Sequence, residues 1–284
     1  MAEGSIGLIG LGLVGSALRE VLTVGGFTVV GCDVDPTKGG VAARPRDVAQ
    51  ACRRVVLSLP TSAEVAEVIG GAAGLLGAET PPEIVIDTTT GHPQAVRRLA
   101  ARLAERGVHL LDATIAGSSR QVAARQAVFL VGGDEAAFRA CADLWGVLAS
   151  RVLHLGPAGS GATAKLAVNL VLGLNRLVLA EGLVFAQRLG LDTRTALALF
   201  ACTPAYSRAM DTKGEKMVSG DFTPEARLAQ HRKDVGLLLD LAREVGQQLP
   251  LTEVHAAVLD GAIAAGEGEL DNSAVILELL RRGG

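Results

Sequence analysis

The residues best suited to chemistry are a lysine and an asparagine near the start of a long apolar segment in the middle of the chain. Lys165 and Asn169 follow a glycine-rich turn, Gly159-Ser160-Gly161. Residues four apart share one face of a helix, so the ammonium and the amide project together. An ammonium can stabilise negative charge that develops on a substrate oxygen and can deliver a proton to it. The spacing therefore predicts a catalytic Lys165 assisted by Asn169.

Lysine is rare in this chain, which makes its placement informative. Of 27 basic residues only Lys38, Lys165, Lys213, Lys216 and Lys233 are lysines, and the other 22 are arginines. Arginine does not give up a proton in proteins, so a site that must exchange one needs lysine. The alternative is a lysine that buries its stem at a helix start and keeps its charge in water.

A glycine motif at the N-terminus predicts a dinucleotide site. An apolar strand, Ser5 to Ile9, runs directly into a GxGxxG turn, and a helical pattern follows it. In this fingerprint the first glycine makes the tight turn, the second lets the backbone approach a pyrophosphate, and the third lets helix and strand pack closely. An ordinary glycine-rich turn is the alternative. The predicted contacts are Gly10, Leu11, Gly12, Leu13, Val14 and Gly15.

An acidic residue after the second predicted strand indicates which dinucleotide is bound. The strand from Phe27 to Cys32 ends in Asp33, 18 residues past Gly15. A carboxylate here hydrogen-bonds a ribose 2′-hydroxyl and repels a 2′-phosphate, which favours NAD over NADP. Arg44 and Arg46 follow closely enough in the sequence to keep NADP open as the less favoured cofactor.

Strands and helices alternate through the first half, which predicts an α/β fold with a doubly wound, Rossmann-type sheet. Ligands of open parallel sheets bind beyond the carboxyl ends of the strands. The Leu59-Pro60 strand end, Thr90 and the segment 112–119 should therefore line one crevice. For the threonine run and the serine pair, ordinary turn chemistry is the alternative. Strands at 127–131 and 152–155 around a helix at 135–148 should close the sheet.

The second half has a helical pattern to its end. Residues 162–188 predict one long helix of ~40 Å at 1.5 Å per residue. Leu166 to Leu174 is apolar on almost every face, so following helices or a second subunit should bury it. Thr223-Pro224 predicts another helix start. We therefore expect a dinucleotide-binding domain at 1–160 and a helical substrate and oligomerisation domain at 161–284, joined by the long helix.

Composition excludes several classes of protein. The 284 residues carry a net charge of −3, which argues against nucleic acid and anionic membranes as partners. Four scattered cysteines predict reduced core thiols in a cytoplasmic protein and no metal site. The apolar run after Lys165 is interrupted by Asn169, Asn175 and Arg176, so it falls short of the ~20 apolar residues of a bilayer span. The N-terminus lacks the basic region of a signal peptide.

These motifs together resemble the β-hydroxyacid dehydrogenases, the family of 3-hydroxyisobutyrate dehydrogenase and tartronate semialdehyde reductase, whose dinucleotide domain is 6-phosphogluconate dehydrogenase-like. The resemblance runs from the first glycine motif to Asp271, nearly the whole chain. It implies a Rossmann-type domain, a helical domain and a cleft between them. It implies that Lys165 is catalytic and that Asn169 helps to place it and the substrate. Members of the family form dimers or tetramers, so the resemblance also implies an oligomer. The implied cofactor contacts beyond the glycine turn are Leu59, Pro60, Glu64, Thr90 and Lys233.

The segment that resembles the family's substrate loop departs from its usual form, Asp-Ala-Pro-Val-Ser-Gly-Gly. Here Thr114 replaces the proline, Ala116 the serine and Ser118 the second glycine. The family serine helps to bind the substrate carboxylate, so a hydroxyl donor is absent where one is expected. The substrate site is predicted at Ala116, Gly117, Ser118 and Ser119 with Lys165 and Asn169, and Arg120 is a further candidate for binding an anion.

The expected function is hydride transfer between NAD and a small β-hydroxyacid or its semialdehyde, with Lys165 as general acid and base. In the oxidative direction the neutral amine would accept the hydroxyl proton, and bound NAD⁺ and low exposure would help to depress its pKa. One alternative is an imine reductase-like NAD(P)H enzyme, although Lys165 argues against it. Another is a non-catalytic, cofactor-binding regulatory protein, against which Lys165 and Asn169 both count.

Overall fold

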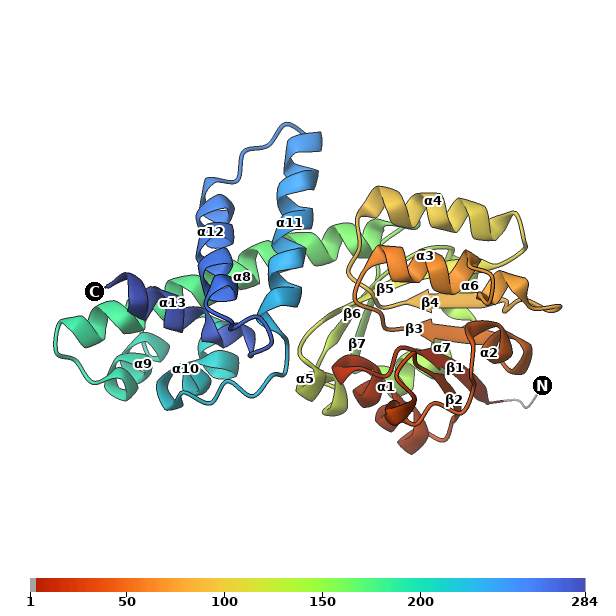
Figure 1. Cartoon of the computed structure of the whole chain (residues 1–284), viewed down its shortest axis with the longest axis horizontal. Coiled ribbons are helices and arrows are strands. Elements are labelled where there is room, and N and C mark those ends of the chain that lie inside the picture. The colour runs from red at the N-terminus through yellow and green to blue at the C-terminus, as the bar shows by residue number, and fades with distance from the viewer. Residues whose placement is uncertain (1–3, 284) are drawn as a thin grey trace. The chain divides into compact units, whose positions relative to one another are not determined.

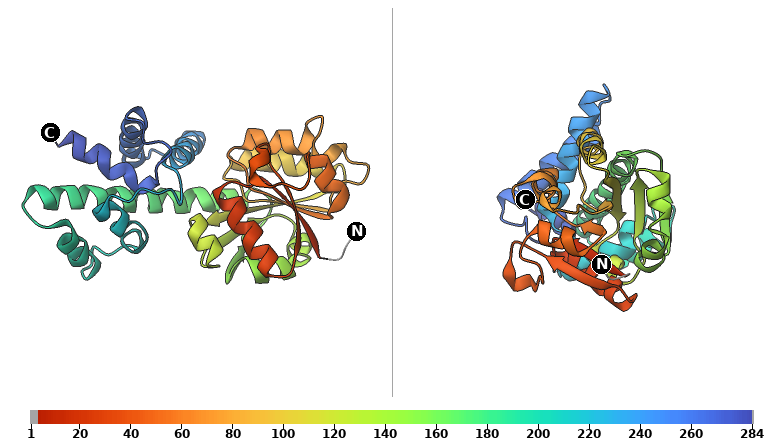
Figure 2. Two further views of the ribbon diagram at one scale, coloured as in Figure 1. Left: turned by 60° about the horizontal axis from the view of Figure 1, so that its bottom comes forward. Right: turned by 90° about the vertical axis from the view of Figure 1, so that its right-hand side faces the viewer.

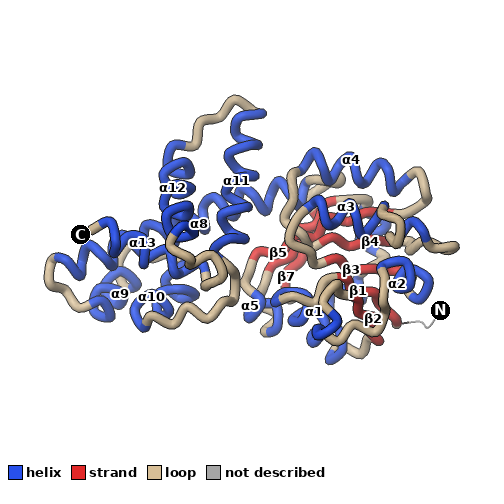
Figure 3. The backbone as a smooth tube through the Cα atoms, in the orientation of Figure 1, coloured by secondary structure: helices blue, strands red, loops and turns tan. Residues whose placement is uncertain are grey.

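The computed structural model describes residues 4–283 and separates into two compact units. The first unit ends at Leu166 and the second begins at Ala167. Figure 3 shows that the strands gather in the first unit and that the second consists of helices and loops. One helix, α8 (Ser160–Arg188), begins in the first unit and continues into the second (Figure 1). The predicted long helix is thus present, and it starts two residues earlier than expected.

The first unit is built on a seven-stranded sheet in the order β2-β1-β3-β4-β5-β6-β7. The first five strands of the chain pair in parallel, whereas β6 is antiparallel to β5 and β7 is parallel to β6. A doubly wound, Rossmann-type sheet is therefore confirmed, with two reversed strands at one edge. The strands are β1 (Ser5–Ile9), β2 (Thr28–Cys32), β3 (Arg54–Leu57), β4 (Ile84–Asp87), β5 (His109–Ala116), β6 (Val128–Gly132) and β7 (Arg151–His154).

Helices cover both faces of this sheet, as Figure 2 shows. Apolar side chains between the helices and the sheet form two cores. One core lies between the sheet and the helices α1 (Leu13–Val24), α5 (Ser119–Ala123), α6 (Glu135–Arg139) and α7 (Ala142–Leu148). The other contains side chains of α2 (Pro45–Ala51), α3 (Ser62–Gly70) and α4 (Pro93–Ala104). Because both faces are covered, the central strands are apolar on both sides, which is why they appear as continuous apolar runs in the sequence.

Two elements of the first unit differ from the sequence prediction. Strand β5 extends to Ala116, so residues 112–116 lie in the sheet and pair with β6 rather than forming a loop. Positions 113–116 carry small or branched side chains, which fit a strand that is covered on both faces. The helix predicted at 135–148 is two helices, with Cys141 as the N-cap of the second.

The second unit contains α8 from Ala167 onward, η3 (Met210–Gly214) and η4 (Asn272–Ala274), and the helices α9 (Thr193–Ala201), α10 (Glu215–Ser219), α11 (Leu228–Glu244), α12 (Pro250–Ala264) and α13 (Val275–Arg282). Apolar side chains of these elements form one core, around Leu179, Leu183 and Leu259. The prediction of a helix start at Thr223-Pro224 is wrong, because α11 begins at Leu228. Thr223 instead bonds Asp221 in the preceding loop.

The four cysteines are free thiols. Cys32, Cys52 and Cys141 are buried in the first unit, as predicted, and burial raises the pKa of Cys52 and of Cys141 to about 11. Cys202 is exposed, so the prediction that all four are core residues is wrong at this position. It follows the last residue of α9, where the chain turns at the surface.

Candidate active site

The glycine turn has the geometry that a dinucleotide requires. Gly10 has a φ of +90°, and a Cβ there would lie 2.2 Å from the Ser58 carbonyl oxygen. A Cβ on Gly15 would lie 1.9 Å from the Gly10 carbonyl oxygen, so helix α1 packs on the turn only without a side chain. Nothing lies within 4 Å of the corresponding point on Gly12, the N-cap of α1. The turn therefore leaves open space at the N-terminus of a helix, where phosphate binds.

Asp33 also forms hydrogen bonds within the protein, in addition to the predicted contact with a ribose. One carboxylate oxygen accepts a hydrogen bond from the Leu11 N–H at 2.6 Å, and the other accepts one from the Asp35 N–H at 2.9 Å. The carboxylate thereby ties the end of β2 to the glycine turn on β1. Each oxygen can accept a second hydrogen bond, so the structural contacts leave capacity for a ribose hydroxyl.

The predicted cofactor residues outside the turn follow β3 and β4, which are neighbours in the sheet. The Leu59 N–H donates to Thr89 Oγ1 at 3.2 Å, which joins the ends of these two strands. Glu64 forms the capping box of α3 with Thr61, and its carboxylate accepts from the Thr61 N–H at 2.8 Å. Pro60 is exposed and Thr90 is half-buried. These residues share one edge of the sheet in the first unit.

The predicted substrate segment is a strand end followed by a short helix. Ala116 is the last residue of β5, and Ser118 is the N-cap of α5. Ser118 forms a capping box with Gln121: its N–H donates to Gln121 Oε1 at 2.9 Å, and its hydroxyl accepts the Gln121 N–H at 3.3 Å. The Ser118 N–H is thus already engaged. Among the candidate anion ligands, the Gly117 N–H and the hydroxyl protons of Ser118 and Ser119 are not used in this capping box.

A buried carboxylate that the sequence analysis assigned no role fixes the start of α8. Asp112 is 1% exposed and accepts hydrogen bonds from the N–H groups of Gly159 and Ala162 at 2.9 and 2.8 Å. Burial raises the pKa of Asp112, and these backbone hydrogen bonds oppose that effect. A Cβ on Gly161 would lie 2.2 Å from the Asp112 carbonyl oxygen, so strand and helix are in direct contact. Asp112 therefore holds the turn from which Lys165 projects.

Lys165 and Asn169 occupy consecutive turns of α8 and are both buried, at 8% and 5% exposure. Lys165 belongs to the first unit and Asn169 to the second. Asn169 Nδ2 donates to Asp234 Oδ2 on α11 at 2.9 Å, which fixes the orientation of the amide. Lys233, predicted to reach the cofactor, forms an ion pair with Asp234 Oδ1 at 3.0 Å. Asp234 thus contacts both predicted residues of the second unit, a role that the sequence analysis did not assign to it.

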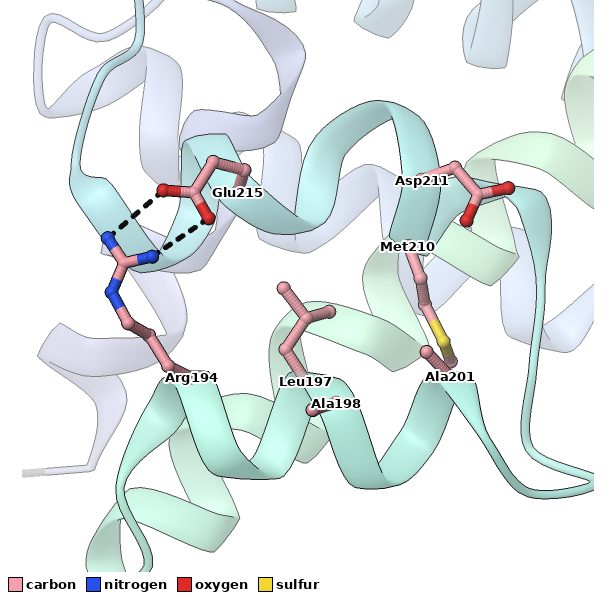
Figure 4. A pocket seen from close by; sticks show the side chains of 7 residues that line it. All are labelled: Arg194, Leu197, Ala198, Ala201, Met210, Asp211 and Glu215. Carbon is pink, nitrogen blue, oxygen red and sulfur yellow. Dashed lines mark hydrogen bonds and ion pairs between the residues drawn. The ribbon is translucent and has the colours of Figure 1, made fainter.

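A surface hollow in the second unit involves none of the predicted site residues. It has a volume of about 290 Å³ and lies between α9 and the segment of η3 and α10 (Figure 4). Arg194 and Glu215 form an ion pair at its rim, at 3.0 Å, over a floor that includes Leu197 and Met210. Because it offers no buried polar group for a substrate, we do not assign the chemistry to it.

Both units match known families. Residues 5–156 match the NAD binding domain of 6-phosphogluconate dehydrogenase, and residues 159–279 match the NAD-binding domain of NADP-dependent 3-hydroxyisobutyrate dehydrogenase. The chain is 32% identical to 2-(hydroxymethyl)glutarate dehydrogenase of Eubacterium barkeri, over 95% of this chain and 93% of that one. It is 31% identical to 2-hydroxy-3-oxopropionate reductase of Escherichia coli, over 97% of both chains.

Solved structures agree with these matches. The crystal structure of 3-hydroxyisobutyrate dehydrogenase from Salmonella typhimurium superposes with a TM-score of 0.87 and 26% identity, over 97% of this chain and 99% of that one. An imine reductase from Pseudomonas sp. shares the fold at a TM-score of 0.66 and 21% identity, over 98% of this chain and all of that one. With sequence matches along nearly the whole chain, the protein is a member of the β-hydroxyacid dehydrogenase family.

Proposed function

We propose that this protein transfers hydride between NAD and a small β-hydroxyacid or its semialdehyde, with Lys165 as general acid and base. The observation that carries the proposal is the buried Lys165 on the first turns of α8, one turn before an Asn169 whose amide is fixed by Asp234. Family membership supports the reaction class. The residue roles are our proposal from geometry and chemistry.

The first unit fits a bound dinucleotide. The open space at Gly12 and the N-terminus of α1 suit a pyrophosphate, and Asp33 has acceptor capacity for a ribose hydroxyl. When bound, NAD(H) supplies the hydride acceptor or donor. In reduction, Lys165 stabilises the charge that develops on the carbonyl oxygen and gives that oxygen a proton from Nζ. In oxidation, Nζ takes the hydroxyl proton, and Asn169 orients the substrate oxygen.

The preference for NAD follows from Asp33. A 2′-phosphate would place a second anion beside this carboxylate, which already lies at the end of β2 and cannot move without breaking its bonds to Leu11 and Asp35. We expect NADH to have a KM at least about tenfold below that of NADPH, since one unfavourable contact of about 1.4 kcal/mol changes binding tenfold. Asp33→Asn should narrow the difference mainly by weakening NADH binding.

The predicted substrate segment lacks the serine with which the family binds the substrate carboxylate. The Gly117 N–H and the hydroxyls of Ser118 and Ser119 remain the proposed carboxylate ligands, together with Arg120. Ser119→Ala should raise the KM for a carboxylate substrate several-fold and leave the KM for NADH unchanged. Equal KM values for the variant and the wild type would remove Ser119 from the site.

The reaction is tested by following absorbance at 340 nm with each cofactor. The panel comprises 3-hydroxyisobutyrate, 2-(hydroxymethyl)glutarate, 2-hydroxy-3-oxopropionate and a cyclic imine. We expect turnover with at least one β-hydroxyacid or semialdehyde, and loss of about 10³-fold or more in kcat for Lys165→Ala. Turnover of the imine alone would favour an imine reductase, whose fold this chain shares. Tight NADH binding without turnover of any compound would favour a regulatory protein.

We further propose a cytoplasmic homodimer or homotetramer that uses no membrane or nucleic acid partner. By length and mean hydropathy, 1.6 over an 18-residue window, α8 is apolar enough to span a membrane. Its buried polar residues Asn169 and Arg176 instead suit a helix packed in protein. Val171, Val178 and Phe185 recur every seven residues on its exposed side, at 57%, 66% and 64% exposure, and a second copy would cover them. Sedimentation of a compact monomer at micromolar concentration would contradict the oligomer.

A further inference from the structure

Thr114, the residue that replaces the usual proline of the family's substrate loop, makes a contact that proline has no atoms to make. It lies in β5 with 0% exposure. Its hydroxyl is 3.0 Å from the carbonyl oxygen of Gly161 on α8 and 3.3 Å from that of Leu130 on β6. A hydroxyl has one proton to donate, and the shorter distance favours Gly161 as the acceptor.

The accepting carbonyl belongs to the turn that carries Lys165. In an α-helix each N–H bonds the carbonyl four residues earlier, so the Gly161 carbonyl of α8 is the partner of the Lys165 N–H. The Thr114 hydroxyl and the Lys165 backbone therefore share one acceptor. A change in the position of this carbonyl moves the backbone from which the ammonium projects.

Thr114 completes a set of contacts between β5 and the first turn of α8. Asp112, two residues earlier on the same face of the strand, accepts from Gly159 and Ala162. The carboxylate thus holds the free N–H groups of the turn, while the Thr114 hydroxyl holds one of its carbonyls. All of these residues lie in the first unit.

We propose that Thr114 is a positioning residue for the general acid and base Lys165, acting through the Gly161 carbonyl. The proposal rests on the proposed role of Lys165. It predicts that the hydroxyl matters to the chemical step more than to cofactor binding, because the glycine turn and Asp33 make no contact with it. It also links the substrate segment, which begins two residues after Thr114, to the lysine through one strand.

The test replaces the hydroxyl without changing the shape of the side chain. Thr114→Val removes the donor and leaves the Gly161 carbonyl with its helical partner, so no buried acceptor is orphaned. We expect kcat to fall about threefold to tenfold, the fold-change that corresponds to the net contribution of one hydrogen bond, with the KM for NADH changed by less than about twofold. Thr114→Ser keeps the donor and should restore kcat to within about twofold of the wild type.

Two comparisons separate positioning from a general loss of stability. Ile84→Val removes a methyl group from the amino end of β4, in an apolar core of the first unit, and should lower the melting temperature while leaving kcat unchanged. Thr114→Cys offers a second variant without a strong donor, should the valine variant not fold. A kcat for Thr114→Val or Thr114→Cys equal to that of the wild type, in a protein whose Lys165→Ala variant is inactive, overturns the positioning role.

The same series distinguishes failure of this inference from failure of the proposed function. An active Lys165→Ala variant removes the lysine from the mechanism and, with it, the basis for positioning. Loss of activity in Thr114→Ser equal to that in Thr114→Val contradicts a role for the hydroxyl even when Lys165 is essential.

Discussion

The two units bury polar side chains in different ways. In the first unit the buried polar residues are mainly hydroxyls and carboxylates that lie in or directly after β4 and β5, such as Asp87, Thr88 and Asp112. Several bond backbone groups: Thr88 Oγ1 donates to the Leu57 carbonyl at 2.7 Å, and Asp87 accepts from the Thr89 N–H at 2.9 Å. Their side chains fasten turns and helix starts to the sheet.

The second unit buries cations and imidazoles within its helical core. Arg176, Lys213, His231 and His255 are each less than 9% exposed. Burial lowers the pKa of Arg176 to about 10, with Asp271 opposing the shift. The rings of His231 and His255 approach to 5.2 Å between centroids, beside a Gly173 on which a Cβ would lie 2.8 Å from His255. The charge and protonation state of these buried groups therefore contribute to the stability of the second unit.

The largest effect should come from Asp271, which is 0% exposed. Its carboxylate accepts from Lys213 Nζ at 2.8 and 2.9 Å and from the N–H groups of Glu225, Ala226 and Ser273. Asp271→Asn removes the charge that offsets Lys213 and should lower the free energy of unfolding by about 3–5 kcal/mol, measured by urea titration. Asp260→Asn, which breaks the exposed pair with Arg232, is the control and should cost less than about 1 kcal/mol. Equal losses of unfolding free energy in the two variants would contradict the expectation that the buried ion pair contributes more to stability than the exposed one.

His255 should give the second unit a pH dependence. Burial lowers its pKa to about 4 from the usual 6.5, with Arg176 and Arg232 adding to the effect. Between pH 6.5 and about 4 the unfolded chain binds a proton here that the folded chain does not, so stability falls as the pH falls. The loss reaches about 3 kcal/mol across this window. Urea titrations at pH 5 and pH 7.5 should show a smaller pH difference for His255→Gln than for the wild type.

The control for this pH dependence is Ile84→Val in β4, which removes no titratable group and should leave the dependence of stability on pH as in the wild type. If the stability of His255→Gln falls between pH 7.5 and pH 5 as steeply as that of the wild type, a group other than His255 causes the pH dependence.

Asp112 tests whether a buried carboxylate of the first unit stabilises the start of α8. Asp112→Asn keeps one acceptor oxygen and loses the other, so one of the bonds to Gly159 and Ala162 must break. The expected cost is about 1–3 kcal/mol of unfolding free energy, together with a fall in kcat because Lys165 is on the same turn. Unfolding by urea and turnover should change together. A stable variant with normal kcat would show that the start of α8 does not depend on this carboxylate.

The smallest effect should come from the surface. Arg139 and Glu135 pair at 2.5 Å on α6, but their side chains are 75% and 64% exposed. Arg139→Ala should change the free energy of unfolding by less than about 0.5 kcal/mol, because water screens such pairs. A loss of more than about 1 kcal/mol by the same urea titration would contradict the expectation that an exposed ion pair contributes less to stability than a buried one.

The sequence predicted those features that depend on local spacing. The tight turn at Gly10 and the helical register of Lys165 and Asn169 each depend on residues within a few positions of one another. Asp33 was found because a strand end and a fixed offset define its place. At each of these positions the neighbouring residue types determine the local conformation of the chain.

Features that depend on residues far apart in the sequence were missed or misplaced. The reversed direction of β6 depends on pairing with β5, and that pairing also extends β5 to Ala116. Asp112 and Thr114 gain their importance from Gly159 and Gly161, nearly fifty residues later, and Asp234 gains its importance from Asn169. Thr223-Pro224 resembles a helix start locally, yet Asp221 captures the threonine in a turn.

The central claim is that Lys165 gives and takes the proton during hydride transfer. The most direct test is a single-turnover measurement of NADH oxidation at 340 nm with Lys165→Ala and a semialdehyde that the wild type reduces, with and without added methylamine. We predict a rate at least about 10³-fold below that of the wild type, normal NADH binding, and partial recovery in proportion to the concentration of the free amine. A variant that consumes NADH at the wild-type rate without the amine would contradict the account.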